Sequence, residues 1–334
     1  MSTGGGLGPT ARWEAGLFTG ATRSRRLLAV GLGVLMALTG IGCSSAPLVT
    51  SPPSPSAVKT TDGPPWQQVW ADDFNGPAGT GVNITNWEYI DGHGNSLFGT
   101  GEVETTTSSP QNIHLDGHGD LDIVARGHGA AGSPGSQWTS ARIKTTSQFE
   151  APAGGEMMVT GSVEQPNPGN GLGYWPGFWM LGVGQWPEDG EIDLMEDVNG
   201  LSNESASMHC GNLTQRNPNG TFGPCDEGTG ITSGLQPCPG CQQGFHTYSV
   251  IVDRRNAAAQ QIRWYLDGKE IFSANESQVG PAVWTPAVDN GFQILLDVAM
   301  GGTFPNARCQ CATPTSQTTS PGTMVVQYVR VYTN

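Results

Sequence analysis

The stretch that decides the fold is EDGEIDLMED, residues 188–197, in which six of the ten residues are acidic. Apolar residues separate three of the acids, Glu191, Asp193 and Glu196. Side chains alternate between the two faces of a regular strand, so Glu191 and Asp193 share a face and Glu196 falls on the other. A β-bulge in the two residues before Glu196 would return that side chain to the first face. The stretch therefore predicts a bulged strand with three carboxyl groups on one face.

Similar strand character recurs along the chain. Short alternating runs are separated by Gly, Pro, Asn and Asp, and no long stretch has the apolar spacing of an amphipathic helix. The sequence thus predicts an all-β chain, a sandwich or a barrel folded as one unit. The clearest strand runs are LDIVAR, FHTYSVIVD, QIRWYLDG, FQILLDVAM and MVVQYVRVY.

The N-terminal region has the pattern of an export signal. Three arginines precede an apolar run at 27–41, which is short for a membrane span and typical of a signal peptide. The run ends in GIGCSS, which resembles a lipobox with Cys43 as the lipidated residue, although the usual leucine is absent. We favour lipidation over simple cleavage. We therefore expect a signal peptide at 1–43, a Ser/Pro-rich tether at 44–65 and one folded domain at 66–334.

Cysteine content fits an exported protein. Without Cys43 six cysteines remain, and an even number in an exported chain indicates disulfides, with fifteen pairings open. The segments CPGC and CQC also allow a zinc site, which we rank below disulfides. The six are Cys210, Cys225, Cys238, Cys241, Cys309 and Cys311.

Charge argues against polyanionic ligands. The formal net charge is −14, and no Lys or Arg lies between Lys144 and Arg216. Nucleic acids bind to basic surfaces, so we expect no nucleic-acid partner. We therefore expect that the ligand of the acidic cluster is not a polyanion.

The three acids of the 191–196 segment suggest hydrolytic chemistry. Clustered carboxyl groups push one another's pKa values apart, which leaves one ionised and another protonated near neutral pH. Glycoside hydrolysis needs that combination of a carboxylate and a carboxylic acid. The alternatives are a solvated strand face and a calcium site, and the spacing alone favours the solvated face.

Aromatic residues near the acids change that judgement. The segment GLGYWPGFWMLG lies just upstream, and Trp186 lies five residues before Glu191. Flat aromatic faces pack against sugar rings. Because Trp175 and Trp186 each precede a proline in Gly-rich turns, we expect them at a binding surface. The core should instead take Phe178, Trp179 and Leu181.

Ordered blocks across residues 66–334 carry a resemblance to a known family. The hexapeptide EIDLME matches Glu-x-Asp-x-x-Glu, and the other matching blocks are WADDFNGPAGTGVNITNWEY, GEVETTTSSPQNIHLDGHGDLDIVA, WTSARIKT, GYWPGFWML, FHTYSV, IRWYLDGK and LLDVAMGG. The chain resembles glycoside hydrolase family 16, in the laminarinase-like branch. This resemblance implies a β-jelly-roll sandwich of two antiparallel sheets with a concave substrate cleft.

The resemblance also implies residue roles. Glu191 would be the nucleophile and Glu196 the acid/base, while Asp193 would hydrogen-bond the nucleophile. His209 would lie on the neighbouring strand near the acid/base, an ordinary strand histidine being the equal alternative. Trp175 and Trp186 would line sugar subsites.

Three segments depart from the family pattern. TGEVE replaces an Asn-Asn-Glu-x-Gln segment, Asp297 stands where Asn is usual, and an Arg-rich segment is replaced by APAGGEMMVTGSVEQ. Some members bind a structural calcium ion, but Gln327 stands where an aspartate is frequent, so we do not count on one. We expect no required cofactor and no catalytic metal.

These observations predict an exported, monomeric, retaining endo-hydrolase of a neutral β-1,3-linked polysaccharide such as laminarin. Lipid at Cys43 would be its only membrane contact. The alternatives are a hydrolase or transglycosylase of β-1,3-galactan or mixed-linkage glucan, and a non-catalytic glucan-binding protein. A tethered envelope protein would leave the clustered acids and tryptophans unexplained.

Overall fold

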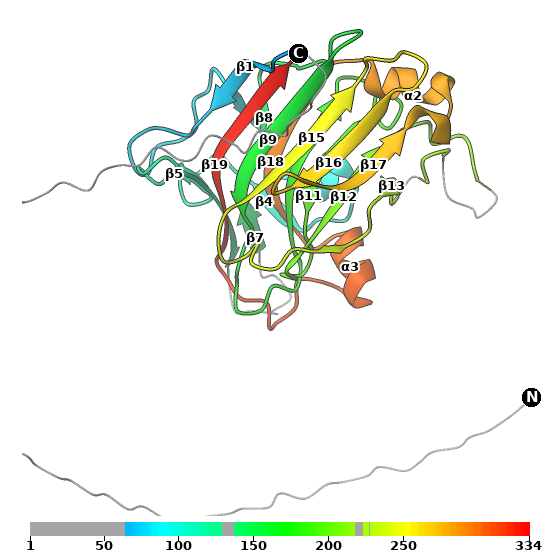
Figure 1. Cartoon of the computed structure of the whole chain (residues 1–334). Coiled ribbons are helices and arrows are strands. Elements are labelled where there is room, and N and C mark those ends of the chain that lie inside the picture. Colours follow the sequence, from blue (N-terminus) through cyan, green and yellow to red (C-terminus); the bar gives the residue numbers. More distant parts are fainter. Residues whose placement is uncertain (1–63, 129–136, 218–222, 227) are drawn as a thin grey trace, which may run out of the picture. The chain divides into compact units, whose positions relative to one another are not determined.

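The computed structural model describes residues 64–128, 137–217, 223–226 and 228–334 (Figure 1). The expected signal peptide, the lipidation at Cys43 and nearly all of the expected tether lie outside the described residues. None of the helices in the described ranges is long and apolar enough to cross a membrane.

The first sheet contains eleven strands. Its path is β17-β16-β15-β9-β19-β6-β7-β4-β3, with β1 paired to β19 and β5 paired to β6. All of its pairs are antiparallel except the parallel pair of β4 and β7. The strands are β1 (Gln67–Asp72), β3 (Gly92–His93), β4 (Glu104–Thr106), β5 (Ile113–Leu115), β6 (Leu121–His128), β7 (Gln137–Ser140), β9 (Glu156–Glu164), β15 (His246–Asp253), β16 (Gln261–Leu266), β17 (Lys269–Asn275) and β19 (Gly322–Thr333).

The second sheet contains eight antiparallel strands. Its path is β13-β12-β11-β10-β18-β8-β2, and β14 pairs with β12. The strands are β2 (Trp87–Tyr89), β8 (Arg142–Thr145), β10 (Tyr174–Gly182), β11 (Glu191–Glu196), β12 (Asn203–His209), β13 (Ile231–Thr232), β14 (Gln236–Pro237) and β18 (Phe292–Met300).

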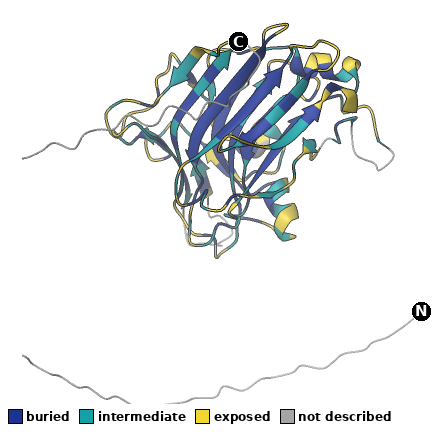
Figure 2. Cartoon of the chain, viewed as in Figure 1, coloured by how far each residue is buried: buried dark blue, intermediate teal, exposed yellow. Residues whose placement is uncertain are grey.

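Both sheets contribute to one core. In Figure 1, β9, β15, β16 and β17 lie side by side in one layer, and β18, β11 and β12 lie behind them. The strands carry most of the buried residues, while the connecting loops are largely exposed (Figure 2). Phe178 of β10 packs so closely on β9 that a Cβ at Gly161 would lie 2.7 Å from its ring. Burying a large apolar side chain of this kind stabilises the fold by about 1.5–3 kcal/mol.

Alternation along single strands explains their placement. In β19 the buried Met324, Val326, Val329 and Val331 point into the core. A register irregularity beside Gln327 shifts the alternation by one residue. Val329 and Val331 therefore face the core, as Met324 and Val326 do. The five strand runs expected from the sequence coincide with β6, β15, β16, β18 and β19, so the all-β prediction is confirmed.

The helices are short and lie outside the sheets. They are α1 (Gly94–Phe98), α2 (Pro281–Val288), α3 (Thr303–Cys309) and the 3₁₀ turn η1 (Glu276–Gln278). The sequence analysis did not anticipate them, because segments of this length show almost no helical period.

Candidate active site

The acidic strand β11 contains the expected bulge. Asp193 pairs with Trp179 of β10, yet Met195 pairs with the adjacent Phe178, so Leu194 is the extra residue. The pairing with β12 is irregular over the same residues. Ile192, Leu194 and Met195 all belong to the hydrophobic core, whereas both glutamates that end the strand are half-buried. The prediction of a bulge in the two residues before Glu196 is confirmed.

A contact from the opposite sheet holds the bulge. The buried indole of Trp264, on β16, donates a hydrogen bond of 2.8 Å from Nε1 to the backbone oxygen of Asp193. A bulge disrupts the local hydrogen-bond ladder, and a buried carbonyl without a partner would be costly. Trp264 therefore satisfies the backbone where the strand changes its alternation.

Asp193 lies in a polar cluster with β12. Ser207 donates to Asp193 Oδ2 at 2.5 Å, and His209 Nε2 lies 3.6 Å from the same oxygen. His209 Nε2 is also 3.7 Å from Glu191 Oε1, because His209 is the register partner of Glu191. As expected, His209 lies on the strand next to β11. Its side chain is beside Glu191 and Asp193, and its charge also acts on Glu196.

Glu196 has a different environment from the other two acids. Trp175 Nε1 donates to Glu196 Oε1 at 2.8 Å. Burial raises the pKa of Glu196 to about 8, and the charge of Asp193 adds to the rise. The hydrogen bond from Trp175 and the charge of His209 oppose it. Glu196 can therefore hold a proton at neutral pH beside an acidic neighbour.

Aromatic side chains flank the carboxyl groups on two sides. Trp175, which hydrogen-bonds Glu196, meets the ring of Phe304 edge-on at 5.9 Å between centroids. Trp186 is 37% exposed, and its ring lies 5.8 Å from that of His209. Both tryptophans predicted at the binding surface are thus close to the acidic cluster, although Trp175 lies within β10 rather than in a turn.

Trp179 is not a core residue, contrary to the sequence analysis. Phe178 is fully buried as expected, but Trp179 and Leu181 are half-buried on the other face of β10. Trp179 Nε1 donates to Asp297 Oδ1 at 2.8 Å. Trp175 and Trp179 lie on one face of β10, and the alternating sequence does not show whether that face is buried or exposed.

A buried ion-pair network was missed by the sequence analysis. Arg142 of β8 is 2% exposed and pairs with Asp297 of β18 at 2.8 Å and with Glu102 at 3.1 Å. Its guanidinium also lies over the Phe98 ring, 4.1 Å from the centroid. Asp297 stands where the family pattern has Asn, whereas Glu102 matches the Glu of the segment that TGEVE replaces. The new acid at position 297, in a chain with few cations, was the available signal for this network.

Asp297 reaches toward Glu196 across a glycine. Gly177 of β10 is the register partner of both residues. A Cβ at Gly177 would lie 3.0 Å from Asp297 Oδ1, so the carboxylate leans over the space that a side chain would fill. The charge of Asp297 contributes to the raised pKa of Glu196.

Glu204 of β12 is fully buried on the core side of the sheet. Neither of its carboxyl oxygens has a hydrogen-bond partner among the described residues. Burial raises the pKa of Glu204 to about 8, and the charge of Glu196 adds to this rise. A protonated Glu204 on the strand beside β11 is consistent with both observations.

All six expected cysteines form disulfides. The pairs are Cys210–Cys225, Cys238–Cys241 and Cys309–Cys311. The ranking of disulfides above zinc agrees with this arrangement.

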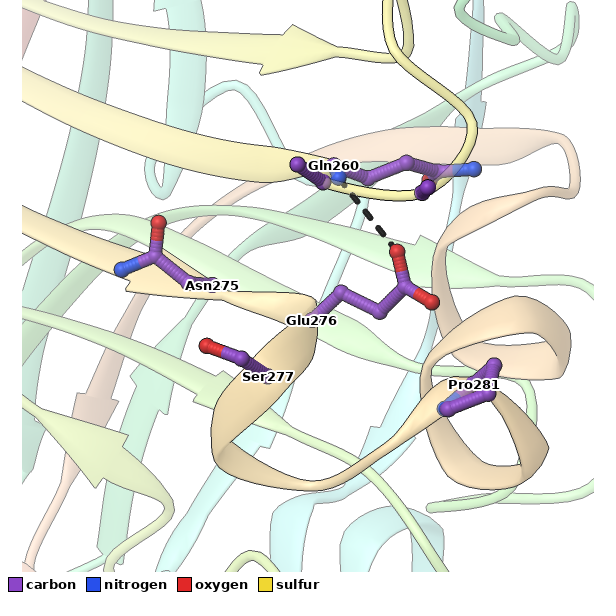
Figure 3. Close-up of a pocket in the computed structure, with 7 residues that line it drawn as sticks. Gln260, Asn275, Glu276, Ser277 and Pro281 are labelled. Carbon is purple, nitrogen blue, oxygen red and sulfur yellow. Dashed lines mark hydrogen bonds between the residues drawn. The ribbon is translucent and has the colours of Figure 1, made fainter.

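One surface pocket lies outside the acidic cluster. It has a volume of about 270 Å³ and is lined by residues that precede β16, by η1 and by the start of α2 (Figure 3). Within it the backbone N–H of Gln260 donates to Glu276 Oε2 at 3.4 Å. Gln260 Oε1 also accepts a bond from Trp284, so this carboxyl–amide pair is part of local packing. None of the lining residues belongs to the acidic cluster.

Comparisons with known proteins point to one family. The family model described as "XgeA-like, catalytic GH16 domain" matches residues 115–234. The crystal structure of an endo-1,3-beta-glucanase from Streptomyces sioyaensis is 42% identical, with a TM-score of 0.71 over 82% of this chain and 99% of that one.

Two curated proteins are more distant relatives. A beta-glucanase from Rhodothermus marinus is 29% identical over 288 residues, covering 80% of this chain and 86% of that protein. The clotting factor G alpha subunit of Tachypleus tridentatus is 28% identical over 274 residues. That match covers 80% of this chain and 34% of the subunit, so the chain spans about a third of this relative.

Proposed function

Because this chain belongs to glycoside hydrolase family 16, we propose that it is a retaining endo-hydrolase of a neutral β-1,3-linked glucan of the laminarin type. The observation that carries the proposal is the bulge in β11, which turns Glu196 to the same face as Glu191 and Asp193. The crystal structure from Streptomyces sioyaensis compared above is named as an endo-1,3-beta-glucanase, and this supports the choice of substrate.

Glu196 is the proposed acid/base. Its pKa of about 8 keeps the carboxyl group protonated at neutral pH, so it can donate a proton to the leaving glycosidic oxygen. The Trp175 hydrogen bond holds one carboxyl oxygen in place. After the first step the same group, now ionised, takes a proton from the attacking water.

Glu191 is the proposed nucleophile. It lies at the start of β11 beside His209, and Asp193 lies two residues along the same face. Its carboxylate attacks the anomeric carbon and forms a covalent glycosyl-enzyme, which water then hydrolyses with net retention. Asp193 is held by Ser207 and His209 and keeps the local field negative as positive charge develops on the sugar. The chain supplies both reacting groups, so the reaction as proposed requires no cofactor.

The charge distribution supports a neutral substrate. Arg142 is buried and paired with two carboxylates, while Lys144 on the same strand pairs with Glu88 at 3.4 Å. Sulfated polysaccharides would need unpaired cations along the binding face. Trp175 and Trp186 are the proposed sugar-stacking residues on either side of the acids.

We also propose that the enzyme is an exported monomer with a lipid anchor at Cys43. The support is the sequence pattern of residues 1–43 and the Ser/Pro-rich stretch that follows it. Labelling with a radioactive or clickable fatty acid tests the anchor, because Cys43→Ser should abolish incorporation. Incorporation that persists in the variant would contradict lipidation at this residue.

The decisive experiment measures reducing-sugar release from laminarin, curdlan, lichenan, β-1,3-galactan and agarose. Wild type should release sugar from laminarin with internal cleavage products, and NMR should show that the first product keeps the β-configuration. Glu191→Gln should abolish release yet retain binding to insoluble curdlan. Glu188→Gln, which changes an exposed acid in the preceding turn, should behave like wild type.

Each alternative has its own outcome. Preference for galactan or lichenan would overturn the substrate assignment while keeping the mechanism. Absence of release from every polysaccharide, with binding intact, would favour the glucan-binding alternative. Full activity in Glu191→Gln would remove Glu191 from the mechanism.

A further inference from the structure

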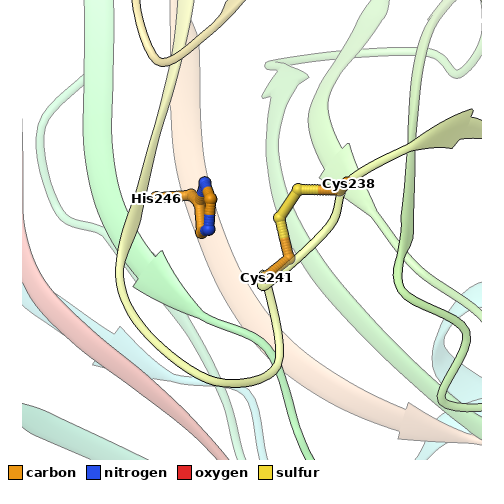
Figure 4. A group of neighbouring side chains, drawn as sticks. All are labelled: Cys238, Cys241 and His246. Atoms are coloured by element: carbon orange, nitrogen blue, oxygen red, sulfur yellow. A yellow bond between two sulfur atoms is a disulfide. The ribbon is translucent and has the colours of Figure 1, made fainter.

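A second cluster of metal-ligating side chains is formed by Cys238, Cys241 and His246. One ligand atom from each of the three lies within 4.8 Å of the others. In the structure the two cysteines are joined as a disulfide. Figure 4 shows the imidazole ring of His246 facing this disulfide from the neighbouring segment. None of these residues takes part in the proposed hydrolysis.

The orientation of His246 is set from outside the cluster. Its Nδ1 lies 2.7 Å from Asp267 Oδ2 in the turn between β16 and β17. The other oxygen of Asp267 accepts from the backbone N–H of Thr247 at 2.9 Å, which fixes the carboxylate. Nε2 is then the nitrogen on the cysteine side, and a Cβ on Gly240, between the two cysteines, would lie 3.4 Å from it.

The cysteine side of the cluster is equally well supported. The backbone N–H of Cys238 donates to the backbone oxygen of Ser202 at 2.9 Å. The backbone oxygen of Cys241 accepts from the backbone N–H of Gln165 at 2.8 Å. The Tyr248 hydroxyl donates to Cys241 Sγ at 2.9 Å. Both cysteines are nearly fully buried, so the backbone around them is held by contacts other than the S–S bond.

We propose that reduction of the Cys238–Cys241 disulfide turns this cluster into a zinc site with Cys238, Cys241 and His246 as ligands. Two cysteines separated by two residues are a common half of a zinc site, and two thiolates with one imidazole form a known three-ligand set. A metal-binding histidine is usually oriented by a carboxylate that hydrogen-bonds its other ring nitrogen. Asp267 already contacts Nδ1 of His246 in this way. Water completes the fourth position.

The chemistry balances with a dithiol as reductant. The dithiol transfers two electrons and two protons to the disulfide, giving two cysteine thiols and an oxidised cyclic disulfide. Zinc binding then displaces both thiol protons into the buffer, so two thiolates offset the charge of the ion. The Tyr248 hydroxyl can donate to the thiolate of Cys241 as it now does to the disulfide sulfur.

The other disulfides lack such surroundings. Among the described residues the only other cluster that could hold a metal is Glu191, Asp193 and His209, which contains no cysteine. Cys309 and Cys311 form a disulfide without a neighbouring histidine or acid in a ligand group. This pair is therefore a matched control for metal binding by reduced cysteines in general.

The experiment titrates the dithiol-reduced full chain with Co²⁺ under anaerobic conditions, after removal of the reductant. Wild type should bind one equivalent and develop a sulfur-to-cobalt charge-transfer band, which Zn²⁺ then bleaches. The oxidised chain should develop no such band. Cys309→Ser/Cys311→Ser should behave like wild type, while Cys238→Ser/Cys241→Ser should lose the band.

Two further variants test the imidazole. His246→Ala should lose the one-equivalent site, and Asp267→Asn should weaken Co²⁺ binding about 10–100-fold, as expected for a residue that orients a ligand. Glu270→Gln, an exposed acid on β17, is the control for charge alone. Circular dichroism and sugar release confirm that each variant is folded.

The proposal is overturned if reduced wild type shows no charge-transfer band. It is also overturned if the band survives in His246→Ala or in the Cys238→Ser/Cys241→Ser variant, or disappears only in the Cys309→Ser/Cys311→Ser control. Because the readout is a spectrum, the result does not depend on the outcome of the hydrolysis assay.

Discussion

Replacing Asp297 with asparagine should move the alkaline limb of the kcat–pH profile to lower pH. Glu196 must be protonated to act as the acid, so kcat falls as pH rises through its pKa, which is about 8 before substrate binds. The negative charge of Asp297 disfavours ionisation of Glu196. Asparagine removes this charge, which lowers the pKa of Glu196.

The magnitude follows from the sheet geometry. Asp297 and Glu196 are separated by one strand at Gly177, which places their Cα atoms about two strand spacings, or about 10 Å, apart. Two unit charges at that distance interact by about 1.7 kcal/mol at an effective dielectric constant of about 20, which is about one pH unit. Arg142 keeps its positive charge in the variant, and this charge also lowers the pKa of Glu196.

The assay is kcat on laminarin between about pH 5 and pH 10, restricted to the range in which circular dichroism shows folded protein. Asp297→Asn weakens the pairing of Arg142, so the unfolding midpoint should fall, but the position of the limb does not depend on the absolute rate. Glu88→Gln removes an exposed carboxylate on β2 and should leave the limb in place. An unmoved limb in Asp297→Asn, or one at higher pH, would refute the electrostatic reasoning.

Three other substitutions test the remaining contacts. Trp186→Ala should raise KM about fivefold with little change in kcat, because an exposed ring beside His209 contributes about 1 kcal/mol of stacking; a kcat-only effect would contradict this. Trp264→Phe keeps an aromatic ring but removes the N–H that donates to the carbonyl of Asp193. The free energy of unfolding in urea should fall by about 1–3 kcal/mol, and kcat should also fall. Unchanged activity would show that the bulge holds without this bond. Burial raises the pKa of Glu204 to about 8 in the folded chain, whereas the pKa in the unfolded chain is about 4.3. The folded chain therefore binds the proton more tightly, and the free energy of unfolding falls as pH rises between these two values. Glu204→Gln should therefore lose less thermal stability than wild type between about pH 5 and pH 9, and an equal loss in calorimetry would rule out this role.

Local patterns were sufficient for five strands, β6, β15, β16, β18 and β19, and for the bulge in β11. Strand period is a property of neighbouring residues, and Ile192, Leu194 and Met195 can all be buried only if the alternation slips once before Glu196. The positions of Glu191 and Glu196 on one face could therefore be predicted from six residues. The exposed position of Trp186 likewise followed from its place in a Gly-rich turn.

The partners of those residues were decided by tertiary structure. His209 stands opposite Glu191 because of the register between β11 and β12, which no local pattern encodes. Trp179 turns away from the core because its strand partner Leu295 lies on that face of β18. An alternating segment predicts that two faces exist, but only packing against the other sheet assigns one of them to the core.

The sequence by itself determined the clearest strands and that three acids share a face, because both depend on a two-residue period. Tertiary structure alone decided that Arg142 meets Asp297, 155 residues away, and that Trp264 meets Asp193, 71 residues away. Those contacts depend on strand order, which places β18 between β10 and β8 and brings β16 across the core. Strand order depends on long-range packing, so the charges that set the pKa of Glu196 are visible only in the folded chain.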